Sequence, residues 1–145
     1  MKLSSRIYII IVISAFILVG VWILATSQPE ESKTVFHVTL ADPKLYQDGI
    51  YSNSFKISKG VYTFRFVPNG DSPEILSITL NGKNFHFFEN FKLIGTSHET
   101  GISEFFTWEY EGENVIEVSE DMEIKISIDP HENILGPVSV ELILY

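Results

Sequence analysis

A run of nineteen consecutive residues without a charge, from Ile7 to Ala25, constrains this 145-residue chain more than any other feature. Thirteen of the nineteen are Ile, Leu, Val or Phe, which together favour insertion into a bilayer by about 4 to 8 kcal/mol. As an α-helix the run is about 28 Å long, close to the ~30 Å hydrocarbon thickness of a membrane. The sequence therefore predicts one transmembrane helix over residues 7–25.

The charges that flank this helix predict its orientation. Lys2 and Arg6 precede it, whereas Glu30 and Glu31 follow it. Basic residues favour the cytoplasmic side of a membrane. We therefore expect residues 1–6 to form a cytoplasmic tip and the rest of the chain to lie outside the cell membrane, with a single pass between them.

The short segment after the helix, residues 26–33, is polar and contains one proline, so it reads as a linker. A cleaved signal peptide is the rival interpretation, because Ala25-Thr26-Ser27 offers small residues for cleavage. Signal h-regions are usually about 7–15 residues long, and this apolar run is longer. An uncleaved anchor is therefore the preferred interpretation.

Beyond the linker, apolar and polar residues alternate with a period of two. Ile124, Ile126 and Ile128 share one face of an expected strand, and turn residues recur about every 8–12 positions. The pattern predicts an all-β domain over residues 34–145, an antiparallel two-sheet β-sandwich such as a jelly roll. The expected strands are 35–40, 54–58, 61–67, 75–80, 84–94, 105–110, 115–118, 123–128 and 138–144.

Two short breaks predict hairpins. Lys59-Gly60 separates two alternating runs, which we expect to pair with each other. Asn81-Gly82 is a dipeptide typical of a tight hairpin turn. It should connect the strand that ends at Leu80 with the next one.

Charge and composition exclude several function classes. The chain has 19 acidic and 10 basic residues, a net charge of −9, whereas nucleic-acid binding needs clustered Lys and Arg. We therefore expect no nucleic-acid partner. Residues 97–145 alone hold twelve acids and one base. This acidic half is either a solvated surface that limits edge pairing, or a cation site or docking surface for a basic partner.

Candidate catalytic residues are missing from the sequence. It contains no cysteine, which excludes thiolate metal sites and cysteine nucleophiles. Its four histidines lack the spacing typical of metal ligands. It also has no Gly-x-Ser-x-Gly elbow and no phosphate-binding glycine loop. We expect no cofactor and no enzymatic activity.

Two loops are rich in oxygen ligands and are candidate calcium sites. Asn69 and Asp71 lie in one, and Asp129 begins the other, which extends to residue 133. Neither follows the EF-hand pattern. Ordinary turns are the competing interpretation.

Two phenylalanines are left over when the aromatic residues are assigned to faces. Alternation places Phe106, Trp108 and Tyr110 on one side of a strand and Phe105 on the other, and Phe88 similarly opposes its neighbours. A two-sheet sandwich buries one face of each sheet. Phe88 and Phe105 are therefore candidates for a contact patch or a platform on which a sugar stacks.

Within residues 37–80 a recognisable set of residues occurs: Asp42-Pro43, Phe55, residues 60–66 (GVYTFRF), Asn69 and residues 75–80. This set resembles the opening of the GOLD domain, the luminal β-sandwich of Golgi cargo receptors. In that family the membrane helix is C-terminal and the sandwich carries paired cysteines, both unlike this chain. The resemblance therefore implies a GOLD-like fold and no catalytic residues. The overall plan also resembles small, N-terminally anchored archaeal sandwich proteins of unknown function.

Together these features predict a membrane-anchored, extracytoplasmic binding or interaction module. It would contact the membrane through residues 7–25 and dock another envelope or membrane protein. The alternative is a small accessory subunit of a larger membrane complex, in which Ser14, Ala15 and Gly20 would help the helix pack closely.

Overall fold

The computed structural model describes residues 33–145. The predicted cytoplasmic tip, the transmembrane helix at 7–25 and all but the last residue of the linker lie outside the described residues. Among residues 33–145 the only helix is a short 3-10 turn, η1 (Pro43–Leu45), and no helix there has the length and apolarity needed to cross a bilayer.

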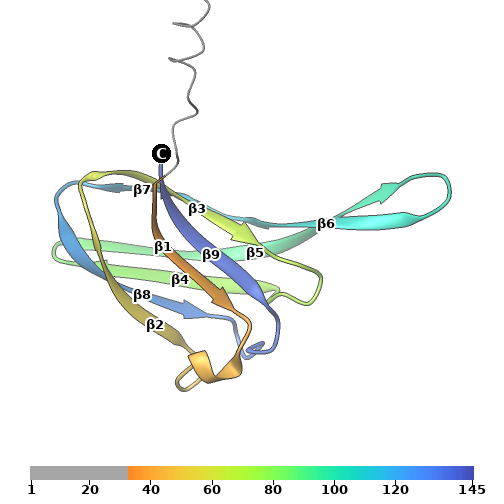
Figure 1. Ribbon diagram of the computed structural model, residues 1–145, viewed down its shortest axis with the longest axis horizontal. Coiled ribbons are helices and arrows are strands. Elements are labelled where there is room, and N and C mark those ends of the chain that lie inside the picture. Colours follow the sequence, from red (N-terminus) through yellow and green to blue (C-terminus); the bar gives the residue numbers. More distant parts are fainter. Residues whose placement is uncertain (1–32) are drawn as a thin grey trace, which may run out of the picture. The chain divides into compact units, whose positions relative to one another are not determined.

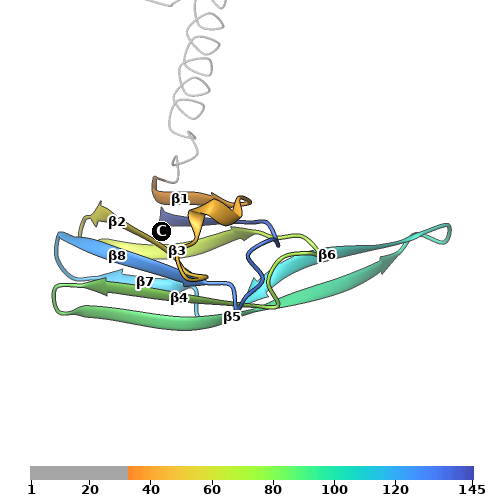
Figure 2. The ribbon, with the colours of Figure 1, turned by 90° about the horizontal axis from the view of Figure 1, so that it is seen from below.

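Two antiparallel sheets build the described domain, as the period-two pattern predicts (Figures 1 and 2). One has four strands in the order β1-β9-β3-β7, and the other has five in the order β2-β8-β4-β5-β6. The strands are β1 (Thr34–Leu40), β2 (Tyr51–Ile57), β3 (Gly60–Val67), β4 (Ile75–Gly82), β5 (Phe85–Glu99), β6 (Glu104–Glu111), β7 (Val115–Val118), β8 (Met122–Asp129) and β9 (Val138–Leu144).

The core lies between the two sheets and is built from the alternating residues. Ile124, Ile126 and Ile128 of β8 are fully buried, as expected from their shared face. Phe64 of β3 joins the sheets, because its ring lies 5.8 Å from Phe87 and 5.7 Å from Phe91 on β5. Such aromatic pairs add stability beyond the area that they bury. The sandwich prediction is therefore confirmed at the level of an all-β fold with two packed antiparallel sheets.

The hairpin predicted at Lys59-Gly60 is wrong. β2 pairs with β8, and β3 pairs with β7 and β9 in the other sheet. The link therefore crosses between sheets, so that Ile57 and Tyr62 both enter the core. Two hydrogen bonds hold this corner: the Lys59 N–H donates to Asp121 Oδ1 (2.8 Å) and the Tyr62 hydroxyl donates to the Ser58 carbonyl (2.8 Å).

The hairpin predicted at Asn81-Gly82 exists, but its turn is two residues later. Asn81 and Gly82 still belong to β4, where Gly82 pairs with Phe85. The turn is formed by Lys83 and Asn84, and Asn84 adopts a left-handed φ of 58°. Gly82 packs closely against β8 instead: a Cβ there would lie 2.6 Å from Met122 Sδ, so the Met122 side chain would have to move.

β5 changes partners along its length. Its first half pairs with β4 as far as Lys92, and its second half pairs with β6 from Lys92 to Glu99. The ribbon beyond Lys92 therefore leaves the sandwich as a two-stranded projection, drawn in blue-green in Figures 1 and 2. We call residues 93–110 the arm. The sequence predicts that this strand ends at Ile94, whereas β5 continues to Glu99 and forms the outer part of the arm.

The buried Tyr46 and the partly buried Tyr110 differ in how their hydroxyls are satisfied. Tyr110 donates a hydrogen bond to the Pro73 carbonyl (2.6 Å). Tyr46 is 9% exposed, and its hydroxyl makes no hydrogen bond within residues 33–145. Burial raises the pKa of both hydroxyls above the ordinary tyrosine value. A buried polar group without a partner costs stability.

Replacing Tyr46 by Phe should therefore raise the free energy of unfolding by about 1 to 3 kcal/mol, because it removes an unpaired buried hydroxyl. The matched variant Tyr110→Phe should lower it by about 1 kcal/mol, because it removes a hydrogen bond. Urea titration of the purified chain followed by circular dichroism measures both. A destabilised Tyr46→Phe variant would show that this hydroxyl has a partner.

Candidate functional site

The first calcium candidate is a loop folded around its own side chains. Asn69 Oδ1 accepts a hydrogen bond from the Asp71 N–H (2.8 Å), and the Asn69 N–H donates to Ser72 Oγ (2.9 Å). The Ser72 hydroxyl in turn donates to the carbonyl of Pro137 (2.6 Å). Asn69 is thus engaged in a turn that links the β3–β4 loop to the loop before β9.

The second candidate loop packs against the first. Asp129 Oδ1 accepts a hydrogen bond from the His131 N–H (2.8 Å), and Asn133 Nδ2 donates to the carbonyl of Asp71 (3.1 Å). The structure therefore brings together the two loops that contain Asn69, Asp71 and Asp129. Among residues 33–145, however, no three His, Asp or Glu side chains group closely enough to hold a metal ion. The calcium site stays a prediction.

Phe88 and Phe105 are both exposed but lie far apart. Their exposed fractions are 54% and 49%. Phe88 pairs with Thr79 inside the sandwich sheet, whereas Phe105 pairs with His98 near the end of the arm. Ten residues of β5 separate Phe88 from His98, which is about 33 Å of strand. The structure places the two rings in separate surroundings rather than in one patch.

The outer part of the arm carries apolar side chains on both faces and at its tip. Phe105 stacks on His98 with ring centroids 4.9 Å apart, and Phe106 stacks on Trp108 at 5.8 Å. Phe105 and Phe106 are adjacent along β6 and therefore point to opposite faces. Ile102, in the tip, is 99% exposed, and Phe106 is 50% exposed. The arm thus presents a concentrated apolar surface to its surroundings.

The root of the arm is fixed firmly to the sandwich. Tyr110 packs 5.2 Å from Phe66 of the other sheet and hydrogen-bonds to Pro73. Trp108 covers two glycines, because a Cβ at Gly95 would lie 2.5 Å from its ring and one at Gly70 would lie 3.1 Å away. Larger residues at either position would push the indole out of place. The arm is therefore held at its root and unsupported at its tip.

Sequence reasoning missed Ile102 and Phe106 as candidate contact residues. Alternation predicts that Phe106 shares a face with Trp108 and Tyr110, and the pairing of β6 with β5 confirms this. The opposing sheet does not reach Phe106, however, because β6 pairs only with the outer half of β5. Phe106 is exposed because β5 extends beyond the sandwich. Residues 95–98 contain no large apolar side chain, so the sequence does not indicate that the strand continues through them.

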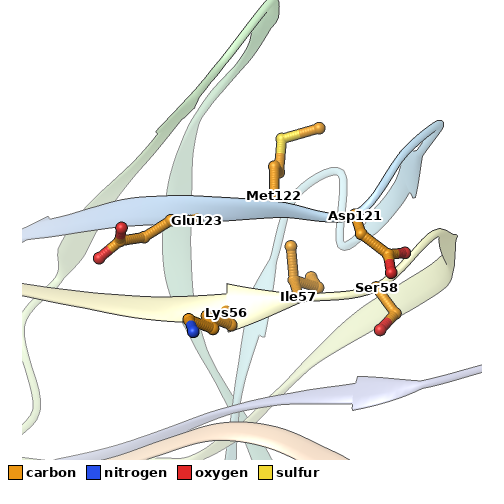
Figure 3. A pocket seen from close by; sticks show the side chains of 6 residues that line it. All are labelled: Lys56, Ile57, Ser58, Asp121, Met122 and Glu123. Atoms are coloured by element: carbon orange, nitrogen blue, oxygen red, sulfur yellow. The ribbon is translucent and has the colours of Figure 1, made fainter.

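A hollow of about 360 Å³ lies between the end of β2 and the start of β8, and Figure 3 shows the side chains that line it. Lys56 and Glu123 line one end of it, and Ser58 and Asp121 lie beside each other at the other end. Asp121 already binds the Lys59 N–H at the β2–β3 corner. This hollow therefore marks a structural corner, and its lining gathers no set of groups suited to catalysis.

The acidic run predicted as a surface feature has no basic counterpart in the described part of the chain. None of its carboxylates lies within 4.0 Å of a basic group among residues 33–145; the ion pairs there involve Glu141 instead. Glu141 accepts a hydrogen bond from Arg65 Nε (2.6 Å) and lies 3.9 Å from His37 Nε2. The run consists of Glu109, Glu111, Glu113, Glu117, Glu120, Asp121 and Glu123.

Comparisons of the chain with protein-family models, with curated proteins and with solved structures find no match. Function therefore has to be argued from the geometry of the molecule itself.

Because the loop oxygens of Asn69 and Asp129 already accept backbone N–H groups, we expect millimolar Ca²⁺ to leave the melting temperature nearly unchanged. A site filled at a hundredfold excess over its Kd would add about 2.7 kcal/mol, and hence raise the melting temperature by roughly 10 °C or more. Scanning calorimetry with Ca²⁺, and with NaCl at matched ionic strength, measures the difference. A Ca²⁺-specific rise that Asp71→Ala or Asp129→Ala abolishes would contradict this expectation.

Proposed function

We propose that this chain is a membrane-anchored, extracytoplasmic β-sandwich module that binds another envelope or membrane protein and catalyses no reaction. The uncharged run at residues 7–25 supports the anchor, and the basic residues before it support a cytoplasmic N-terminus. The observation that carries the proposal is the arm, whose outer half exposes apolar side chains on two faces.

The low stability expected of an isolated arm supports the proposal that a partner binds it. A two-stranded ribbon is marginally stable in water without further packing, and exposed apolar patches are typical of surfaces that bind another molecule. Ile102, Phe105 and Phe106 would lose contact with water on docking, which is favourable at about 25 cal/mol per Å² of apolar surface. The fixed root keeps the approach geometry constant, which lowers the ordering cost of binding.

The charge of the arm indicates what kind of partner surface would bind it. Beyond Lys92 the β5–β6 ribbon has no Lys or Arg, and it carries Glu99, Glu104, Glu109 and Glu111. Glu99 and Glu104 are direct cross-strand neighbours, a like-charge pair that destabilises an isolated ribbon. A partner with Lys or Arg around an apolar pocket would relieve this repulsion and accept the aromatic rings.

The finer features of the architecture belong to the same proposal. The transmembrane helix over 7–25, the linker and a jelly-roll or GOLD-like arrangement of the sandwich rest on the sequence and on its resemblance. The two-sheet antiparallel fold supports the sandwich at the level of class and does not bear on the helix or the linker. An accessory subunit of a larger complex differs from this reading in using its membrane helix as the main contact.

A photo-crosslinking amino acid tests which surface docks. Placed at Ile102 or Phe106 in the full-length chain, it should give crosslinks in intact cells to one membrane or envelope protein with a basic surface. The matched position Phe88 has a similar exposure but lies outside the arm, and it should give none. Equal crosslinking from all three positions, or from the helix residue Ala15 alone, would reject the arm as the contact surface.

Protease accessibility tests the orientation. Protease added outside intact cells or spheroplasts should digest residues 33–145 and spare a short N-terminal fragment, because the domain lies outside. Complete protection of the domain would reverse the topology. Mass spectrometry should find residues 7–25 retained in the mature protein, whereas an N-terminus at Gln28 would show a cleaved, secreted protein.

A further inference from the structure

Eight residues line a groove of about 370 Å³ on the outer face of the five-stranded sheet. Six of them form a regular grid across three strands, because their register pairs are Ser127–Thr79–Phe88 in one row and Asp129–Ser77–Asn90 in the next. Directly paired residues on neighbouring strands, and residues two positions apart on one strand, present their side chains to the same face of a sheet. The grid therefore faces away from the core. Ile50 and His131 complete the lining.

The floor of the groove is a polar network centred on Ser77. This serine is 7% exposed, and its hydroxyl contacts both Asn90 Oδ1 (2.5 Å) and His131 Nε2 (2.7 Å). Since each of these contacts is short enough for a hydrogen bond, the three side chains fix one another's positions. The groove is thus ordered before any ligand arrives, which reduces the entropic cost of binding.

The loop that supplies His131 is strained. His131 and Glu132 both adopt left-handed φ values, 50° and 72°, a conformation that costs energy for residues other than glycine. Asp129 stabilises it by accepting the His131 N–H (2.8 Å), and the Asn133 N–H donates to the Pro130 carbonyl (3.2 Å). In this backbone conformation the His131 imidazole lies within hydrogen-bonding distance of the Ser77 hydroxyl. Strained backbone that is maintained in this way is characteristic of binding and catalytic sites.

The chemistry of the lining selects among ligand classes. It contains no Lys or Arg and a single carboxylate, Asp129, so an anion meets no positive charge and a multivalent cation meets only one carboxylate. It does offer hydroxyl and amide groups that both donate and accept hydrogen bonds, beside Phe88, whose ring is 54% exposed. An aromatic face next to convergent polar groups suits a ligand with an apolar C–H face and many hydroxyls.

We propose that this groove binds a neutral saccharide, with Phe88 as the stacking platform and Asn90, His131 and Ser127 as the hydrogen-bonding groups. The site is independent of the arm, since it lies within the sandwich sheet and shares no residue with residues 93–110. A single chain could thus hold a glycan and a protein partner on separate surfaces.

The test uses the full-length chain in phosphatidylcholine nanodiscs, because glycoside detergents would compete for the groove. An array of neutral oligosaccharides identifies bound glycans, and titration calorimetry measures their Kd. We expect binding to at least one neutral glycan, with Kd weakened tenfold or more by Phe88→Ala and by Asn90→Ala.

Phe105→Ala is the matched control. The Phe105 side chain is about as exposed as that of Phe88, but it lies on the arm and does not line the groove. It should leave the Kd within twofold of the parent value. The proposal is overturned if the array shows no bound neutral glycan, if Phe88→Ala binds like the parent, or if Phe105→Ala loses as much affinity as Phe88→Ala.

Discussion

The contact of Phe66 with Phe91 and Tyr110 determines how the rest of the domain is arranged. The Phe66 ring on β3 lies 4.7 Å from Phe91 on β5 and 5.2 Å from Tyr110 on β6, so it joins the two sheets at the place where the arm departs. Without this packing β5 would have no fixed point at which to exchange β4 for β6 as its partner. The same strand can therefore belong to a buried sheet in one half and to an exposed ribbon in the other.

Because β5 pairs with β4 in one half and with β6 in the other, it carries two surfaces of different chemistry. In the sandwich half, the outer face of β5 contributes Phe88 and Asn90 to a groove whose lining carries one carboxylate and no base. In the arm half, acidic side chains surround exposed aromatic rings. An acidic, apolar projection and a nearly neutral, hydroxyl-rich groove suit different ligands, and the rigid β-sandwich holds both in place.

Local periodicity predicted most of the strands, because burial on one face imposes alternation. The residues Ile124, Ile126 and Ile128 are an example, and all three are fully buried. Strand partners were harder to predict: nothing in Lys59-Gly60 distinguishes a hairpin from a crossing between sheets, since the choice depends on where β8 and β9 lie. The groove depends on a contact between Ser77 and His131, 54 positions apart, and on a left-handed backbone at two residues that are not glycine, His131 and Glu132. Neither leaves a pattern in one sequence.

Hydrogen exchange measured by NMR on the full-length chain in micelles tests most directly whether β5 is divided as described. Amides of β4 and β8, and those amides in the first half of β5 that face β4, including Phe91, should exchange only through global unfolding, because they pair inside the sandwich. Amides from Thr96 to Phe105 should exchange several orders of magnitude faster, through local opening of the unsupported arm. Uniform protection along the whole of β5 would contradict the account, as would rapid exchange at Phe91.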